Sequence, residues 1–136
     1  MAEIQGDEYA IEILTGAGIE ELIIDDGGPC FDIAETRFYY NVTASEEDDL
    51  IFQFTCPVAE NLNLSEALLR AVAHKSPILS SVSLSEQLDK TVTLVVNADV
   101  IVGWNKDGDI TAVNFILRSM HTQVLEMQNS WSRILK

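Results

Sequence analysis

The stretch DITAVNFILRSMHTQVLEMQNSWSRI, residues 109–134, decides the fold, because it carries the longest regular pattern in the chain. Its apolar residues form two series with a spacing of seven, and together they alternate at spacings of three and four. Asp109 is the predicted N-cap. The pattern predicts one continuous helix, about 38 Å long, with its apolar stripe on one side. The first series is Ile110, Leu117, Val124 and Trp131, and the second is Val113, Met120, Met127 and Ile134.

A β-hairpin is predicted before this helix. Residues 36–43, TRFYYNVT, are rich in aromatic and β-branched side chains, and residues 50–55, LIFQFT, form the returning strand. Neighbouring residues of a strand point to opposite faces of the sheet, so we expect apolar side chains on both faces. Helices of the same chain then cover both faces, or one face or edge accepts another protein. Phe38, Tyr40, Phe52 and Phe54 take one face, and Tyr39 and Ile51 take the other.

The remaining elements complete an α+β domain. Residues 63–75 show one apolar helical face, with Asn63 as the expected cap and Glu66 as its capping-box partner. The element order is α-β-β-β-α-β-β-α. We therefore expect residues 1–136 to form a single domain, an antiparallel twisted sheet flanked by helices with a long C-terminal helix. The other expected elements are a short helix at 8–15 and strands at 30–34, 78–84 and 91–97.

The net negative charge of the chain comes from its N-terminal part. The net charge is −14, and residues 1–60 hold 15 acids but only one base, Arg37. Phosphate groups are repelled by such a surface, which argues against nucleic acids and anionic membranes as partners. Met1–Asp7 has no signal-peptide pattern, and no apolar window is long enough to span a bilayer. We expect a cytoplasmic protein in which Cys30 and Cys56 are buried free thiols.

No pattern for catalysis or metal binding emerges. His74 and His121 lack the flanking motifs of a nucleophile and its base, so structural roles are expected for both. The acidic run at 46–49 predicts a solvated turn, and residues 105–109 lack the glycine and glutamate positions of a calcium loop. Nothing singles out a catalytic pair among the 22 acids, the neighbours Asp32 and Glu35 included. We expect no enzyme, no cofactor and no metal.

Four segments resemble the class I type III secretion chaperones, the CesT/SycE-like family. They are IEELIIDDGGPCF at 19–31, LIFQFTCPV at 50–58, NLSEALLRAVAHKS beginning at Asn63, and NSWSRILK at the C-terminus. The resemblance implies a homodimer in the bacterial cytosol without ATPase activity. It also implies binding of the extended N-terminal segment of a secreted effector, which adds strands to the dimer and stays soluble and competent for secretion.

The resemblance also implies site residues by position. An extended segment pairs its backbone with a sheet edge and fills apolar pockets with alternate side chains. The expected effector-binding residues are Ile11, Leu14, Phe38, Tyr40, Phe52 and Phe54. The expected dimer interface is formed by Leu64, Leu68, Ala71, Val72, Ile78 and Val82.

Two other classes of function fit the same sequence. A small acidic immunity or antitoxin protein is also a pure binding protein, but it neutralises a folded toxin. A small enzyme with a site built from scattered acids needs a metal. The sequence leaves a heterodimer open and does not identify the partner.

Overall fold

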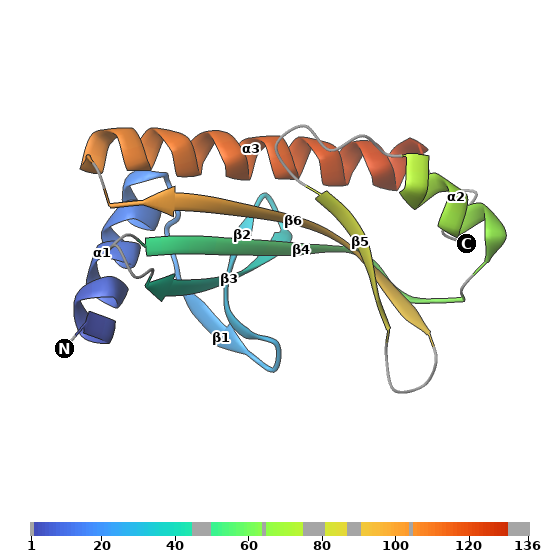
Figure 1. The fold of residues 1–136 in the computed structure, drawn as a ribbon, viewed down its shortest axis with the longest axis horizontal. Coiled ribbons are helices and arrows are strands. Elements are labelled where there is room, and N and C mark those ends of the chain that lie inside the picture. The colour runs from blue at the N-terminus through green and yellow to red at the C-terminus, as the bar shows by residue number, and fades with distance from the viewer. Residues whose placement is uncertain are drawn as a thin grey trace.

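Six strands form one antiparallel sheet in the order β1-β2-β3-β4-β6-β5 (Figure 1). The computed structural model describes residues 2–44, 50–63, 65–74, 81–86, 91–103 and 105–130. These residues form a single domain around one hydrophobic core, which confirms the predicted α+β class. The elements are α1 (Ala2–Gly16), β1 (Ile23–Asp25), β2 (Gly28–Ile33), β3 (Thr36–Ala44), β4 (Leu50–Leu62), α2 (Glu66–His74), β5 (Ser81–Glu86), β6 (Val92–Val102) and α3 (Lys106–Ser130).

The sheet has one strand more than the sequence predicts. β1 pairs with β2 in the register Ile23↔Cys30 and Asp25↔Gly28, so the acidic turn connects a tight hairpin. Gly28 has a φ of 114°, which glycine adopts at little steric cost. Three residues are too few to show the alternation by which a strand is recognised, and β1 was therefore missed.

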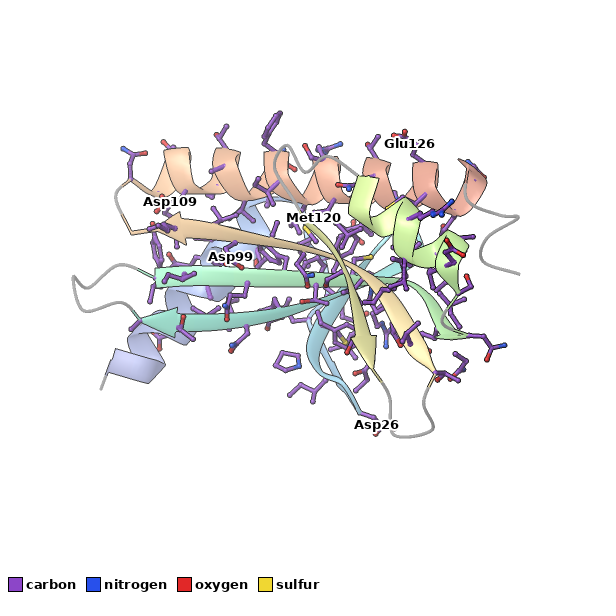
Figure 2. The ribbon with its side chains drawn as sticks, turned by 45° about the vertical axis from the view of Figure 1, so that its right-hand side comes forward. Asp26, Asp99, Asp109, Met120 and Glu126 are labelled. Atoms are coloured by element: carbon purple, nitrogen blue, oxygen red, sulfur yellow. The ribbon has the colours of Figure 1, made fainter. Side chains whose placement is uncertain are left out.

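Helices α1 and α3 lie on the same face of the sheet. α3 contacts β4 and β6 while α1 contacts α3 and β3, and Figure 1 shows α3 running along the sheet. The predicted stripe of α3 is confirmed within the described residues, since five of its members are at most 1% exposed. Figure 2 shows Met120 on the sheet side. The buried members are Val113, Leu117, Met120, Val124 and Met127, whereas Trp131 and Ile134 lie outside the described residues.

The N-cap of α3 differs from the prediction. The helix begins at Lys106, and the Gly108 N–H donates to Asn105 Oδ1 at 2.8 Å, so Asn105 is the cap. Asp109 is instead buried at 6% exposure. Its Oδ2 accepts hydrogen bonds from the Tyr9 hydroxyl at 2.5 Å and from the Gly103 N–H at 2.8 Å. Asp109 therefore joins α1, the end of β6 and α3.

The cap of α2 also lies later than expected. The Leu68 N–H donates to Ser65 Oγ at 3.1 Å, which makes Ser65 the N-cap of a helix that begins at Glu66. The predicted cap, Asn63, lies outside the helix. The expected capping box is wrong because Glu66 occupies the first helical position, and it forms an ion pair with Arg70 on the same helix.

Strand β4 continues past the point where the sequence predicts its end. It runs through Pro57 to Leu62, and its pairing with β6 shifts register between Pro57 and Ala59 and again before Leu62. Proline is tolerated in a strand at such an irregularity. None of the described helices is long and apolar enough to span a membrane.

Candidate functional site

The sheet has one face that α1 and α3 leave uncovered. On β3, β4 and β6 the even-numbered residues face α1 and α3, so the odd-numbered residues point the other way. No helix within the described ranges covers the part of this second face where Asn41, Gln53 and Asp99 are exposed and Ile101 is 61% exposed, whereas Thr93 and Val95 near the start of β6 are buried. We call this surface the open face. It consists of Tyr39, Asn41, Ile51, Gln53, Thr55, Asn97, Asp99 and Ile101.

Strand register brings these residues into cross-strand rows. Gln53 of β4 lies between Asn41 of β3 and Asp99 of β6. In the next row, Thr55 lies between Tyr39 and Asn97 by the same pairings. Tyr39 and Ile51 lie on this face as predicted, but most residues of the open face are polar, so the prediction of a sheet apolar on both faces is wrong.

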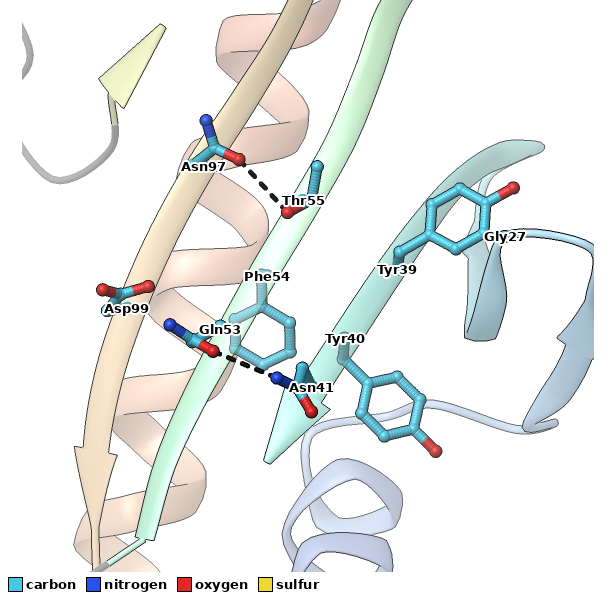
Figure 3. A pocket seen from close by; sticks show the side chains of 9 residues that line it. All are labelled: Gly27, Tyr39, Tyr40, Asn41, Gln53, Phe54, Thr55, Asn97 and Asp99. Atoms are coloured by element: carbon cyan, nitrogen blue, oxygen red, sulfur yellow. Dashed lines mark hydrogen bonds between the residues drawn. The ribbon is translucent and has the colours of Figure 1, made fainter. Parts of the chain in front are cut away.

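A hollow of about 490 Å³ lies on the open face (Figure 3). Most of its side chains carry hydrogen-bonding groups, and Figure 3 shows them rising from three neighbouring strands. A hollow of this size is within the range of ligand pockets. Its lining consists of Gly27, Tyr39, Tyr40, Asn41, Gln53, Phe54, Thr55, Asn97 and Asp99.

Hydrogen bonds between strands fix the polar side chains of the hollow. Asn41 Nδ2 donates to Gln53 Oε1 at 3.1 Å, and the Thr55 hydroxyl donates to Asn97 Oδ1 at 3.1 Å (Figure 3). Asn97 Nδ2 in turn donates to Ser83 Oγ on β5 at 2.8 Å. The first bond joins β3 to β4, and the other two join β4, β6 and β5. These bonds hold the side chains in place before any partner arrives, which lowers the entropy cost of binding.

A charged cluster fixes Tyr39 at the rim of the hollow. The Tyr39 hydroxyl donates to Asp25 Oδ2 at 2.8 Å, and Arg37 forms ion pairs with Asp25 at 3.0 Å and Asp32 at 2.8 Å. The hydrogen bond from Tyr39, supported by Arg37, lowers the pKa of Asp25 from 3.8 to about 2. Asp32 is thus occupied by Arg37, which also lowers its pKa. Glu35 is exposed in a left-handed turn at a φ of 70°.

The structure places most of the predicted effector-binding residues in the core. Leu14, Phe38, Phe52 and Phe54 are at most 1% exposed, because α1 and α3 cover the face of the sheet to which the strand residues point. The expectation that these side chains line open pockets is therefore corrected for the single chain. Ile11 is 48% exposed on α1, and Tyr40 is half-buried and contributes to the hollow.

Sequence reasoning missed the polar members of the hollow. Gln53 lies between Phe52 and Phe54 on β4, and Asn41 lies between Tyr40 and Val42 on β3. This alternation is typical of a strand with one face exposed to solvent. Most of the effector-binding residues predicted from the sequence lie on the face that α1 and α3 cover, and their role in binding stays a prediction.

The predicted dimer interface is only partly within the described residues. Leu68 is 1% exposed and belongs to the core of the single chain. Ala71 and Val72 lie on α2, and Val82 of β5 pairs with Val96. The side chains of these three residues, and all of Leu64 and Ile78, lie outside the described residues. The interface remains a prediction.

The nucleophilic groups are buried. Cys30 and Cys56 are free and buried, as expected. Burial raises the pKa of Cys56 to about 12, so it remains a neutral thiol at physiological pH. His121 lies edge-on to the ring of Phe38, with 6.2 Å between the ring centroids.

Metal-binding side chains are dispersed. The described ranges contain no cluster of three or more histidine, cysteine or acidic residues that could hold a metal ion. The acidic run at 46–49 and the side chain of His74 lie outside those ranges. Residues 105–109 begin α3 rather than form an ion-binding loop.

Comparison with known proteins gives a distant structural likeness. No family model matches the chain, and no curated protein matches it. Among solved structures, the chain is similar to the Yersinia pestis type III secretion chaperone SycH, solved in complex with a stable fragment of YscM2. The similarity has a TM-score of 0.45 and 14% sequence identity, and it covers 87% of this chain and 95% of that chain.

Proposed function

We propose that this chain is a binding protein that holds an extended segment of another polypeptide on the open face of its sheet. The observation that supports the proposal is the one-sided sheet, whose uncovered face carries a hollow of about 490 Å³ with pre-positioned polar side chains. An extended segment suits such a surface because it repeats side chains with the same period as the strands beneath it.

The edge of the sheet adds a second means of holding such a segment. β5 is the last strand in the order, so within the described residues one of its edges has no strand beside it. Unpaired backbone groups on an edge strand are a template for an added strand. A segment that crosses the open face and pairs with β5 gains side-chain contacts from the first and backbone hydrogen bonds from the second.

The finer form of the proposal follows the resemblance in sequence. In this form the chain is a cytoplasmic bacterial chaperone and a homodimer. It holds the N-terminal segment of a type III secreted effector without ATP and is not an enzyme. The acidic character of the chain supports a soluble carrier, because a large net charge opposes self-association.

A matched pair of variants tests the proposal. Thr55→Trp fills the hollow, whereas Thr122→Trp makes the same change on the exposed side of α3. Tagged wild-type protein and both variants are used to capture partners from the native cytosol, and each captured partner is then titrated as a purified fragment. We expect Thr55→Trp to lose the partner and Thr122→Trp to keep it.

The form of the bound partner separates a chaperone from an immunity protein. A chaperone protects a segment that proteases cut readily when it is free. Capture of a folded domain whose toxic activity is inhibited supports the immunity or antitoxin alternative instead. Equal capture by the wild type and Thr55→Trp contradicts the open face as the binding site.

A further inference from the structure

Asp99 differs in its contacts from the acids that form hydrogen bonds or ion pairs elsewhere in the molecule. It is the one carboxylate among the described residues that line the hollow, and Figure 2 shows it on β6. Asp25 and Asp32 are paired with Arg37, and Asp109 accepts two hydrogen bonds. Among the described residues, Asp99 has neither an ion pair nor a hydrogen-bond donor. The carboxylate of Asp99 is therefore available in the hollow, where none of the described residues pairs with it.

The polar groups around Asp99 keep both donor and acceptor capacity, since the side-chain amides of Asn41, Gln53 and Asn97 retain unused N–H groups as well as oxygen lone pairs. Gln53 Oε1 and Asn97 Oδ1 each accept one hydrogen bond, and a carbonyl oxygen has a second lone pair to offer. The Thr55 hydroxyl donates its hydrogen to Asn97, and so is left with acceptor capacity only. These free acceptor positions, together with the carboxylate of Asp99, can bind a partner side chain that carries several donors.

An aromatic ring completes the lining. The hydroxyl of Tyr39 is held by Asp25, so the residue offers its ring to the hollow rather than a free polar group. Aromatic rings attract cations through their faces. Tyr39 lies across the hollow from Asp99 (Figure 3), so the carboxylate and the nearby acceptors are the groups that suit an arginine or lysine side chain.

The neighbouring row of the open face is apolar. Ile51 pairs with Ile101 across β4 and β6, one row beyond the Gln53–Asp99 pair. Alternate residues of a strand lie about 7 Å apart, and an extended guest repeats its side chains with that same period. An extended segment that places a basic residue beside Asp99 therefore places the residue two positions away in its sequence on the two isoleucines.

We propose that the hollow binds an arginine or lysine of an extended polypeptide segment. In this arrangement, the Ile51–Ile101 pair binds an apolar side chain of the same segment, two residues away from its arginine or lysine. This inference rests on the proposed function and specifies the chemistry of the partner. The net charge of −14 supports it, because a basic segment is attracted to the chain before contact.

Peptide selection with matched charge variants tests the inference. Short linear peptides of random sequence, displayed on bacteriophage, are selected on the immobilised full chain. The selected peptides are synthesised and titrated against the wild type, Asp99→Asn, Asp99→Lys and Glu126→Gln. Glu126 is exposed on α3, away from the hollow (Figure 2), so its variant removes the same charge elsewhere.

We expect the selected peptides to share a basic residue with an apolar residue two positions away. Asp99→Asn should weaken their binding about tenfold, which is the size of one lost charge-assisted hydrogen bond. Asp99→Lys should abolish binding, and Glu126→Gln should leave it unchanged. Binding should also weaken as salt is added.

The possible failures are distinguishable. Peptides that bind the wild type and Asp99→Lys equally overturn the basic anchor but leave the proposed function standing. Selected peptides without a common basic residue do the same. A wild-type chain that selects no peptide at all overturns the proposed function and the inference with it.

Discussion

Asp109 shows how a single residue can connect three elements. Its carboxylate accepts hydrogen bonds from Tyr9 on α1 and from Gly103 at the end of β6, and it lies in the first turn of α3. We expect Asp109→Ala to lower the free energy of unfolding by about 2–3 kcal/mol, because two partly buried hydrogen bonds to a charged acceptor are lost. Urea denaturation measures the change.

The exposed Asp99→Ala provides the control for this prediction. Asp99 has no hydrogen bond to lose among the described residues, so its replacement should change the free energy of unfolding by less than about 0.5 kcal/mol. Equal losses for the two variants contradict the role assigned to Asp109.

The lowered pKa of Asp25 predicts that the folded chain loses stability in acid. Its pKa falls from 3.8 to about 2 in the folded chain, chiefly through the hydrogen bond from Tyr39. A lowered pKa means that the folded state favours the ionised form. This stabilising contribution is therefore present above pH 3.8 and is lost as the pH falls through about 2.

NMR titration of the Asp25 carboxyl measures the shift directly. Tyr39→Phe should move the Asp25 midpoint back towards 3.8, since it removes the main cause. Asp26→Asn, which removes a neighbouring exposed charge, should leave the midpoint near 2. A wild-type midpoint at 3.8 shows that the hydrogen bond is absent in solution.

At the scale of elements, α3 was the most predictable part of the chain. Its stripe of spacings three and four is a long-range signal, and packing against β4 and β6 buries it as expected. The helix ends were less predictable, since Asn105 and Asp109 are both good caps by residue type. Only the three-dimensional contact with Tyr9 explains why Asp109 is buried instead.

The strands show a different limit of sequence reasoning. Alternation predicts which residues share a face, and Phe52 with Phe54 were grouped correctly. Alternation does not say which face the helices cover. The buried face was therefore taken for a binding face, whereas Asn41 and Gln53 mark the face that meets solvent.

Two leucine-to-alanine variants test the packing of α3. Leu117 is 1% exposed against the sheet, and its replacement should cost about 2–4 kcal/mol through lost contacts and a cavity. Leu125 is 43% exposed on the same helix, so Leu125→Ala should cost less than about 1 kcal/mol. Comparable unfolding midpoints in urea for both variants argue that α3 does not dock as described.

At the scale of the whole molecule, we propose a homodimer formed through α2. Leu69 is 49% exposed on this helix, next to the buried Leu68. Light scattering should give the wild type twice the chain mass of 15.1 kDa and give Leu69→Glu the mass of one chain. Leu68 is unsuitable for this test, because a charge there disrupts the core of the single chain.

Leu125→Glu provides the matched control for the dimer. It places the same charge at a partly exposed leucine of α3, and the dimer mass should be unchanged. A wild-type mass of 15.1 kDa contradicts the proposed dimer but not the binding face, which belongs to one chain.

The most direct test of the whole account is an NMR titration of the wild-type chain with a selected peptide. We expect the largest changes in backbone amide shifts at residues 39–41, 53–55 and 97–99, on the three strands that form the hollow. Amides on the outer side of α3, around Phe115 and Thr122, should remain unchanged. The largest changes on that side of α3, with none on the three strands, would contradict the open face as the binding surface.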